Sequence, residues 1–329
     1  MSKLIPTIYD VAKEAGVSIA TVSRVLNFPH RVNPTTRTAV INAIENLGYI
    51  PKAESRARAL MGTRRIGILI PFFTEPSFVQ RLRGIASVLN KKDYEMVIYP
   101  VDSKSRSLSY LETLPMRGML DGLIIVSQVF EPNISKRLLD YKLETVVLEF
   151  YDPNFTTLLI NDEWGGELAT KYLLEKGHQR IAFVGGQKQP EFGVDPISKR
   201  LAGYRKVIHQ AGLTFPIEYI HEYAFSPEQV LKKLIPFGLP LSIFAATDLQ
   251  AIALIKEARI MGLRIPQDIA IIGFDNIDMA EYFGLSTVHQ PLDESGRIAA
   301  SLLISRLTSP KQSNQHIELP LKIIQRETA

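Results

Sequence analysis

The chain contains no cysteine among its 329 residues. Disulfide bonds, thiolate metal sites and cysteine nucleophiles are therefore excluded, and such a chain suits a reducing compartment. Long apolar runs are also missing, because no stretch of about 18 apolar residues occurs, so no membrane span is expected. Residues 1–10 lack an apolar stretch followed by small residues, which argues against a secretory signal. We therefore expect a cytoplasmic protein with no membrane partner.

Recognisable catalytic and metal-binding patterns are equally scarce. No Ser/His/Asp ordering and no phosphate-cradling glycine motif stands out. His178 lies in a predicted turn between a helix and a strand, where a capping role suits it better than catalysis. We therefore predict no enzyme, no catalytic residue, no cofactor and no metal site. The six histidines, which show no metal-ligand spacing, are His30, His178, His209, His221, His289 and His316.

Positive charge is concentrated at one end of the chain. Residues 1–65 hold ten Lys and Arg against four Asp and Glu, a net charge of +6, whereas the rest of the chain carries −2. A small basic segment on a nearly neutral body suggests that the segment meets a polyanion. On charge alone, a solvated basic face is an equally good interpretation.

The basic segment predicts three short helices. Thr7, Ser18 and Asn33 are suitable N-caps for them, while Gly16 and Gly48 are typical of helix ends. The first two helices, joined by a three-residue turn, form a helix-turn-helix pattern. Apolar residues recur at helical spacing and should face a shared core: Ile8, Val11, Ala12, Ala15, Val22, Val25, Leu26, Val40, Ile41, Ile44 and Leu47.

The second predicted helix, 19–26, has a face that suits the major groove of DNA. Arg24 can pair bidentately with guanine, and the small apolar side chains of Ile19 and Ala20 can meet a thymine methyl group. Any other three-helix domain is the alternative interpretation. Hydroxyl and amide side chains nearby can bond phosphates and set the register: Ser18, Thr21, Ser23, Asn27 and Thr36.

The motif IYDVAKEAGVSIATVSRVLN at 8–27 resembles the headpiece of the LacI/GalR (lactose/galactose repressor) family, as do NPTTR at 33–37 and GYIP at 48–51. The resemblance implies a DNA-binding domain over 1–50 in which Ile19, Ala20 and Arg24 read bases. One headpiece reads only a few base pairs, so two of them on a palindromic operator are expected. To the backbone-contacting set we add Ile8, Tyr9, Asn33 and Tyr49.

Residues 51–65 connect this headpiece to the body. They favour a helix of about ten residues, which is too short to be stable alone in water. In the family such a hinge helix enters the minor groove, where a leucine wedges open a base step. Arg58 stands at the usual leucine position here, so either Arg58, with Arg56 nearby, or a shifted Leu60 would enter the groove. A plain basic linker is the alternative.

From residue 66 onward, short apolar runs alternate with amphipathic stretches. Such alternation predicts parallel sheets with helices on both faces, and the length favours two lobes. We predict a doubly wound α/β body that resembles periplasmic binding proteins, with an N-lobe of about 66–161 and 291–320 and a C-lobe of about 162–290 and 321–329. Strands are expected at 66–71, 95–101, 122–126, 145–149, 157–160, 180–184, 219–223, 241–245, 269–274, 287–290 and 319–326.

Side chains just beyond these strands are candidates for binding a ligand, because open α/β sheets bind ligands at the carboxyl ends of their strands. Aromatic faces with carboxylates, amides and a guanidinium suit a hydroxyl-rich neutral ligand such as a sugar, or a flat heterocycle. Other roles stay open: Phe72 as a core residue, Glu149 as the partner of a surface cation, and Asp248 as a helix N-cap. The candidates are Phe72, Phe73, Phe78, Ser127, Glu149, Arg200, Phe225, Thr247, Asp275 and Gln290.

The family resemblance extends over the body through DGLII at 121–125, GHQRIA at 177–182, RLAGY at 200–204 and IGFDN at 272–276. It implies that Arg200 and Asp275 clamp the ligand. Thr247 and Glu149 depart from the usual Asn and Asp, and the loop 187–195 lacks the basic pattern of purine-binding members. A sugar or sugar derivative is therefore favoured. The resemblance further implies these wall positions: Phe78, Glu149, Phe225, Thr247 and Gln290.

Together these features predict a sequence-specific transcriptional regulator, a repressor by type, whose operator affinity is controlled by a small molecule bound between the lobes. We expect a homodimer joined along the body, because the leucine-heptad tail of tetrameric relatives is absent. A solute-binding protein, or a sugar-metabolising enzyme that uses Glu149 and Asp275, is the alternative. The effector, the operator sequence and the direction of control stay open.

Overall fold

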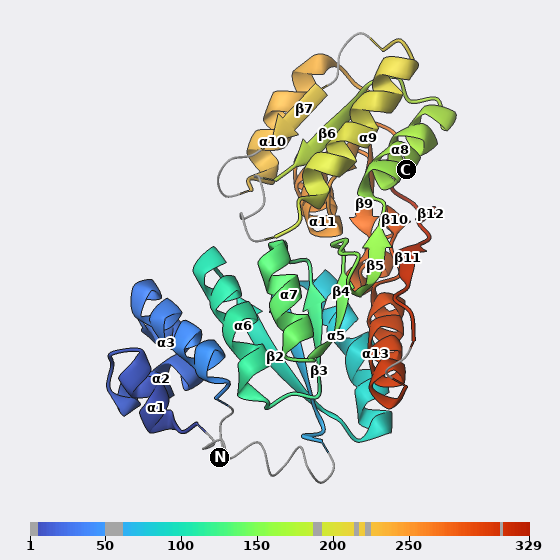
Figure 1. Cartoon of the computed structure of the whole chain (residues 1–329). Coiled ribbons are helices and arrows are strands. Elements are labelled where there is room, and N and C mark those ends of the chain that lie inside the picture. Colours follow the sequence, from blue (N-terminus) through green and yellow to red (C-terminus); the bar gives the residue numbers. More distant parts are fainter. Residues whose placement is uncertain (1–5, 50–61, 187–192, 214–216, 221–224, 310–311) are drawn as a thin grey trace.

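The computed structural model describes residues 6–49, 62–186, 193–213, 217–220, 225–309 and 312–329. It confirms a helical headpiece attached to an α/β body of two lobes (Figure 1). None of the helices in these ranges is long and apolar enough to cross a membrane.

The headpiece helices form where the local signals predict them. The Asp10 carboxylate accepts hydrogen bonds from both the N–H and the hydroxyl of Thr7, each at 2.7 Å. Ser18 Oγ accepts from the Thr21 N–H at 3.2 Å, and Gly48 ends the last helix with φ +62°. The expected apolar positions share one core cluster. The elements are α1 (Ile8–Glu14), α2 (Ile19–Asn27), η1 (Pro29–Arg31) and α3 (Pro34–Leu47).

The N-lobe is a parallel six-stranded sheet between two helical layers. Its strand order is β11-β5-β4-β3-β1-β2. Side chains from alternate positions of β1 pack on opposite faces, Ile68 toward α5 and α13 and Leu69 toward α6 and α7. The elements are β1 (Arg65–Pro71), α5 (Pro76–Leu89), η2 (Asn90–Lys92), β2 (Glu95–Val101), α6 (Lys104–Arg117), β3 (Gly122–Val126), α7 (Pro132–Asp140), β4 (Glu144–Leu148), β5 (Thr156–Ile160), α13 (Leu292–Thr308) and β11 (His316–Leu319).

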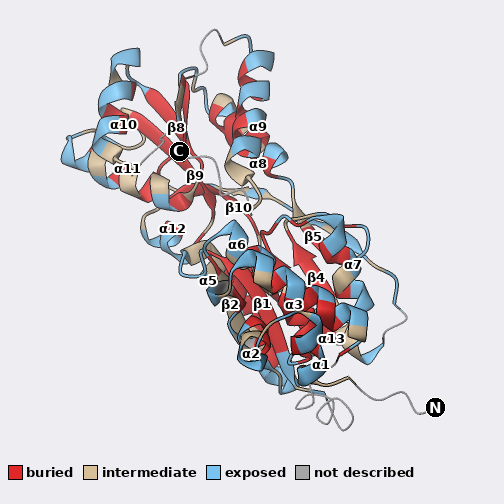
Figure 2. Cartoon of the chain, turned by 60° about the vertical axis from the view of Figure 1, so that its left-hand side comes forward, coloured by how far each residue is buried: buried red, intermediate tan, exposed pale blue. Residues whose placement is uncertain are grey.

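The C-lobe repeats this design with strand order β12-β10-β9-β8-β6-β7. Helices α8 and α9 cover one face, and α10 and α11 cover the other. The strands are buried and the outer helix faces are exposed (Figure 2). The elements are α8 (Asp162–Glu175), β6 (Ile181–Gly185), α9 (Pro196–Gln210), β7 (Ile217–Ile220), α10 (Pro227–Leu234), η3 (Ile235–Phe237), β8 (Leu241–Ala245), α11 (Asp248–Ile260), β9 (Ile269–Asp275), α12 (Asp278–Tyr282), β10 (Ser286–His289) and β12 (Lys322–Ile324).

Two expectations about the strands are wrong. The single final strand expected over 319–326 is broken at Pro320 into β11 and β12, which join different sheets. Proline has no N–H to donate to a ladder, so it suits the point where the chain leaves one lobe for the other. The sheets are also not wholly parallel, because β12 runs antiparallel to β10.

Candidate functional site

The second helix of the helix-turn-helix presents its expected reading face to solvent. The exposed fraction of Ile19 is 40%, and Ala20 and Arg24 are also exposed. The opposite side of α2 is fixed in the headpiece core by Val22 and Val25, which are fully buried. This arrangement leaves small apolar side chains and one guanidinium free to approach base edges.

The expected backbone-contacting residues divide into three groups. Tyr9, Ser18 and Asn33 are exposed, and four others are half-buried: Ile8, Thr21, Ser23 and Thr36. Tyr49 is different, because it is buried in the headpiece core with an exposed fraction of 7%. Its contact with the DNA backbone stays a prediction, because the cluster that buries it here also includes Met116 and Tyr141 of the body. The remaining predictions lie outside the described residues: the side chain of Asn27, and Arg56, Arg58 and Leu60.

A cavity of about 110 Å³ lies where the ends of β1, β3 and β4 face β9, β10 and α9. An adjoining cavity of about 260 Å³ shares several of its walls. Of the candidate ligand residues, Phe225 and Phe73 do not line the first cavity; Phe225 packs instead against the C-lobe core. The structure brings the other eight together: Phe72, Phe78, Ser127, Glu149, Arg200, Thr247, Asp275 and Gln290.

Four of these residues have a backbone conformation that non-glycine residues rarely adopt. Their φ angles are +45° for Phe72, +53° for Ser127, +66° for Glu149 and +117° for Asp275. Each follows or closes a strand, so the chain turns sharply there and directs the side chain into the cleft. Such conformations cost about 1–3 kcal/mol each and cluster where geometry serves a function.

Arg81 is a cleft residue that the sequence reasoning missed. Its side chain is 3% exposed and pairs with Glu149, which also accepts a hydrogen bond from the Ser127 hydroxyl. Arg81 Nη2 donates to Gln290 Oε1 at 3.0 Å as well. The helical spacing of Phe78, Arg81 and Ile85 on one face of α5 is the signal that could have identified it. The glutamate at position 149 is thus the partner of a buried cation, not of a surface one.

The C-lobe wall is built around a second buried guanidinium. Arg200 Nε donates to Asp162 at 2.9 Å and Nη1 donates to the Ala246 carbonyl at 2.6 Å, with the guanidinium 3.5 Å from the Phe274 ring centroid. Asp275 Oδ1 lies 3.7 Å from Arg200 Nη1 and accepts from Gln290 Nε2 at 2.5 Å. The structure therefore brings Arg200 and Asp275 together, as the resemblance implies.

Burial controls the charge of the cleft carboxylates. Burial raises the pKa of Asp275 to about 6, although the neighbouring Arg200 guanidinium opposes the shift. The pKa of Asp162 is also raised by burial and lowered in part by Arg200. Two guanidiniums thus face several carboxyl groups in the cleft, an arrangement that can bind the hydroxyl groups of a neutral ligand in both donor and acceptor roles.

Asp248 is not the N-cap that the sequence suggests. Thr247 caps α11, since its hydroxyl oxygen accepts from the Gln250 N–H at 3.3 Å. Asp248 is fully buried and accepts hydrogen bonds from the Thr287 hydroxyl at 2.6 Å and the Ile277 N–H at 2.9 Å. It therefore fixes the turn that follows Asp275 at the end of β9.

Among the residues that the structure describes, no group of three or more His, Asp or Glu is arranged to hold a metal ion.

Comparison with known proteins agrees with this architecture. Residues 7–52 match the family model of bacterial regulatory proteins of the lacI family, and residues 170–329 match the periplasmic binding protein-like domain. The HTH-type transcriptional repressor PurR of Erwinia tasmaniensis is 34% identical over 98% of this chain and 96% of its own length. The ribose operon repressor of Escherichia coli K12 is 32% identical over 98% of this chain and 99% of its own length.

A solved structure of a LacI family transcriptional regulator from Enterococcus faecium, with bound ribose, has a TM-score of 0.69 and 31% identity to this chain. It covers 80% of this chain, and the match spans 98% of that protein. The headpiece, the two-lobed body and these similarities lead to one conclusion. The chain belongs to the lacI family of bacterial regulatory proteins and is an effector-controlled, DNA-binding transcriptional repressor.

Proposed function

We propose that the effector of this repressor is a sugar or sugar derivative bound in the cleft between the lobes. The observation that carries the proposal is the convergence of two aromatic rings, Phe72 and Phe78, with Arg200, Asp275 and Gln290 around one cavity. Rings supply apolar area for a sugar face, while charged and amide groups orient hydroxyls. The ribose operon repressor and the ribose-bound regulator support the same ligand class.

Within this proposal, Arg200 and Asp275 clamp the ligand from the C-lobe. Glu149 and Ser127, at the ends of β4 and β3, contact it from the N-lobe. Because the ligand touches both lobes, its binding changes their relative position and thereby the geometry of the two headpieces. Coupling of this kind is typically about 1–3 kcal/mol and acts in both directions.

We further propose a homodimer on a palindromic operator, with Ile19, Ala20 and Arg24 reading bases in each half-site. Large apolar side chains are exposed on neighbouring elements of the body, and such patches mark interfaces. Arg83 of α5 pairs with Asp278 of α12, so these elements are adjacent. The residues and their exposed fractions are Tyr282 (87%), Ile260 (67%), Val79 (47%), Met279 (41%) and Leu249 (39%).

The proposal is tested by titrating labelled operator DNA with the protein in the presence of ribose and of other monosaccharides. We expect one sugar to change operator affinity by about 5- to 150-fold, in a direction that the titration itself establishes. Chromatography after incubation should return that sugar unchanged, which separates a regulator in the cytoplasm from a sugar-metabolising enzyme. Intact operator binding that no sugar or sugar derivative alters would overturn the choice of ligand class.

A further inference from the structure

The headpiece does not stand apart from the body in this structure. It lies beside α6 (Figure 1), and its core cluster includes two body residues, Met116 of α6 and Tyr141 at the end of α7. Met116 is only 4% exposed. The covalent linker over 50–61 is therefore not the only connection between the DNA-binding domain and the N-lobe.

Two ion pairs join α3 of the headpiece to α6 and α7 of the N-lobe, and the headpiece supplies the cation in one and the anion in the other. Arg37 Nε on α3 donates to Glu112 Oε2 on α6 at 3.2 Å, with side-chain exposures of 5% and 19%. Glu45 on α3 pairs with Arg137 Nη2 on α7 at 3.0 Å. The headpiece thus contributes one cation and one anion, and the lobe contributes the complementary charges.

The spacing of these pairs defines an orientation. Arg37 and Glu45 are separated by about 12 Å along α3, at 1.5 Å per residue. Reversing the direction of α3 on this surface would bring Arg37 to Arg137 and Glu45 to Glu112. Like charges would then meet, and a nearly buried guanidinium without a carboxylate is strongly unfavourable. The charge pattern accordingly selects one way of docking.

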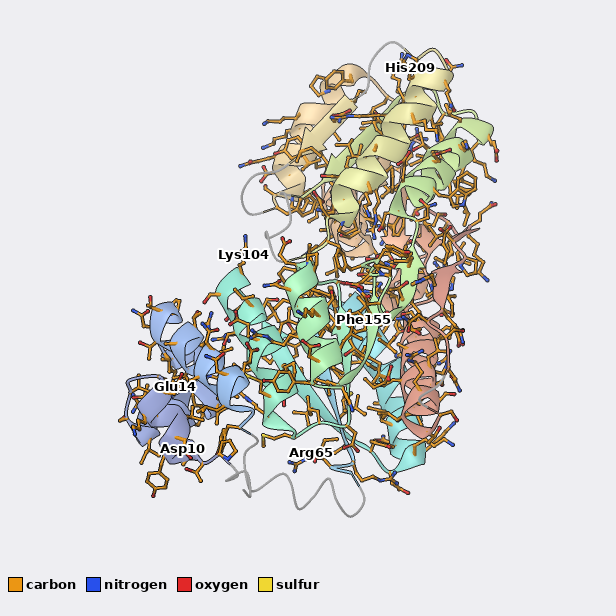
Figure 3. The ribbon with its side chains drawn as sticks, in the orientation of Figure 1. Asp10, Glu14, Arg65, Lys104, Phe155 and His209 are labelled. Atoms are coloured by element: carbon orange, nitrogen blue, oxygen red, sulfur yellow. The ribbon has the colours of Figure 1, made fainter. Side chains whose placement is uncertain are left out.

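Docking leaves the reading face accessible. Ile19, Ala20 and Arg24 on α2 stay exposed, although η1 and α2 also lie against α6 and α3 pairs with the lobe through Arg37 and Glu45. Figure 3 labels Lys104 at the cleft end of α6 and Arg65 at the other end of the N-lobe, where the chain enters the body. The docked pairs lie in the later turns of α6 and α7, away from Lys104. The three base-reading side chains are therefore not covered by the lobe in the docked headpiece.

An open groove of about 680 Å³ borders the contact. It is lined by Ile44 and Tyr49 of the headpiece and by Met116, Asn133 and Lys136 of the lobe, among others. Contacts between domains of one chain commonly allow relative motion, so the docked headpiece can also separate from the lobe.

We propose that the surface formed by Glu112, Met116, Arg137 and Tyr141 is a docking site for the chain's own headpiece, and that docking orients the headpiece for operator DNA. A headpiece held in one orientation loses less freedom on binding than one that moves freely on a linker. The N-lobe then acts on the headpiece directly as well as through the linker. This inference rests on the DNA-binding function of the family and not on the proposed effector.

The test uses a double reversal, Glu112→Arg with Arg137→Glu, which breaks both pairs and preserves the net charge. The matched control is Arg264→Glu with Asp268→Arg, which reverses the exposed C-lobe pair at 2.7 Å. Because the chain has no cysteine, Asn42→Cys at an exposed position of α3 gives a single dye site for time-resolved fluorescence anisotropy of the full-length protein without DNA.

In the control variant the headpiece should rotate together with the body, so we expect a single slow rotational correlation time. Its operator affinity should be unchanged. The double reversal should add a fast component and weaken operator binding by at least about fivefold, without altering the thermal melting of the body. Adding Arg37→Glu and Glu45→Arg restores the pairs in inverted form and should remove the fast component. A fast component already present in the labelled parent, or operator affinity that is unchanged or tighter in the double reversal, would overturn the proposal.

Discussion

Arg81 of the N-lobe reaches across to Gln290, with Arg81 Nη2 lying 3.0 Å from Gln290 Oε1. Gln290 makes a second hydrogen bond toward the C-lobe, because its Nε2 donates to Asp275 Oδ1 at 2.5 Å. A chain of hydrogen bonds therefore runs from α5 to the C-lobe carboxylate that faces Arg200. Arg81 Nε is buried without a hydrogen-bond partner in the described part of the chain. Unpaired buried donors are unfavourable, so this atom favours a ligand that brings an acceptor.

Replacing Arg81 by Gln should weaken effector binding by roughly 10- to 100-fold, because a charged hydrogen bond is worth about 1.5–3 kcal/mol. Glu149 would also lose the cation that neutralises it. Isothermal titration calorimetry with the identified sugar measures the change. Arg264→Gln removes a guanidinium from an exposed pair and serves as the control, with affinity expected to stay within twofold or so. Equal affinities for Arg81→Gln and the parent would exclude Arg81 from ligand binding.

The DNA-binding headpiece and the ligand cleft differ in how much of each could be predicted from the sequence. The headpiece helices depend on local signals, such as Thr7 with Asp10, and these signals were sufficient. Most cleft residues could be predicted because the carboxyl ends of parallel strands lie at the same edge of a sheet. Arg81 was missed because its burial depends on Glu149 and Gln290, which are 68 and 209 residues away. The helical spacing of Phe78, Arg81 and Ile85 places Arg81 on the buried face of α5, but it does not identify the distant partners of the guanidinium.

The raised pKa of Asp275, about 6, predicts pH-dependent effector binding. A hydroxyl donor prefers the carboxylate to the carboxylic acid, so binding should be strongest where Asp275 is ionised. Affinity should be constant above about pH 7 and fall by roughly tenfold for each pH unit below 6. Calorimetry from pH 5 to 8 measures this profile. In Asp275→Asn the affinity should be lower but flat over the same range; an identical slope in both proteins would assign the titration to another group.

Arg24→Ala should weaken operator binding and relax its specificity at one base pair. A bidentate arginine–guanine contact discriminates by about 1–3 kcal/mol, which corresponds to roughly 5- to 150-fold. Fluorescence anisotropy with operators that carry each of the four base pairs at the guanine position measures both effects. Arg31→Ala is the matched control, because Arg31 is exposed on η1 with its guanidinium 5.5 Å from the Phe28 ring. It should reduce affinity for all four operators alike, and the same uniform loss in Arg24→Ala would contradict base reading.

Asp121 holds the point where the linker enters the body. Its carboxylate accepts hydrogen bonds from the Thr63 N–H at 2.6 Å, the Thr63 hydroxyl at 2.9 Å and the Arg64 N–H at 2.8 Å. Asp121 directly precedes β3, and Ser127 directly follows it in the cleft. One strand therefore connects the anchor of the linker to a wall of the candidate ligand site.

Asp121→Ala should leave effector affinity unchanged and reduce the effect of the effector on operator affinity. Strand β3 would still respond to the ligand, but the end of the linker would no longer be hydrogen-bonded to it and would not follow its movement. Operator titrations with and without effector give the ratio of affinities, which should fall toward one in the variant. Asp102→Ala removes an exposed carboxylate from the same lobe, where it pairs with Arg106, and should keep the parental ratio. If Asp121→Ala keeps that ratio too, coupling does not depend on this anchor and must reach the headpiece by another route, such as the docking surface on α6 and α7.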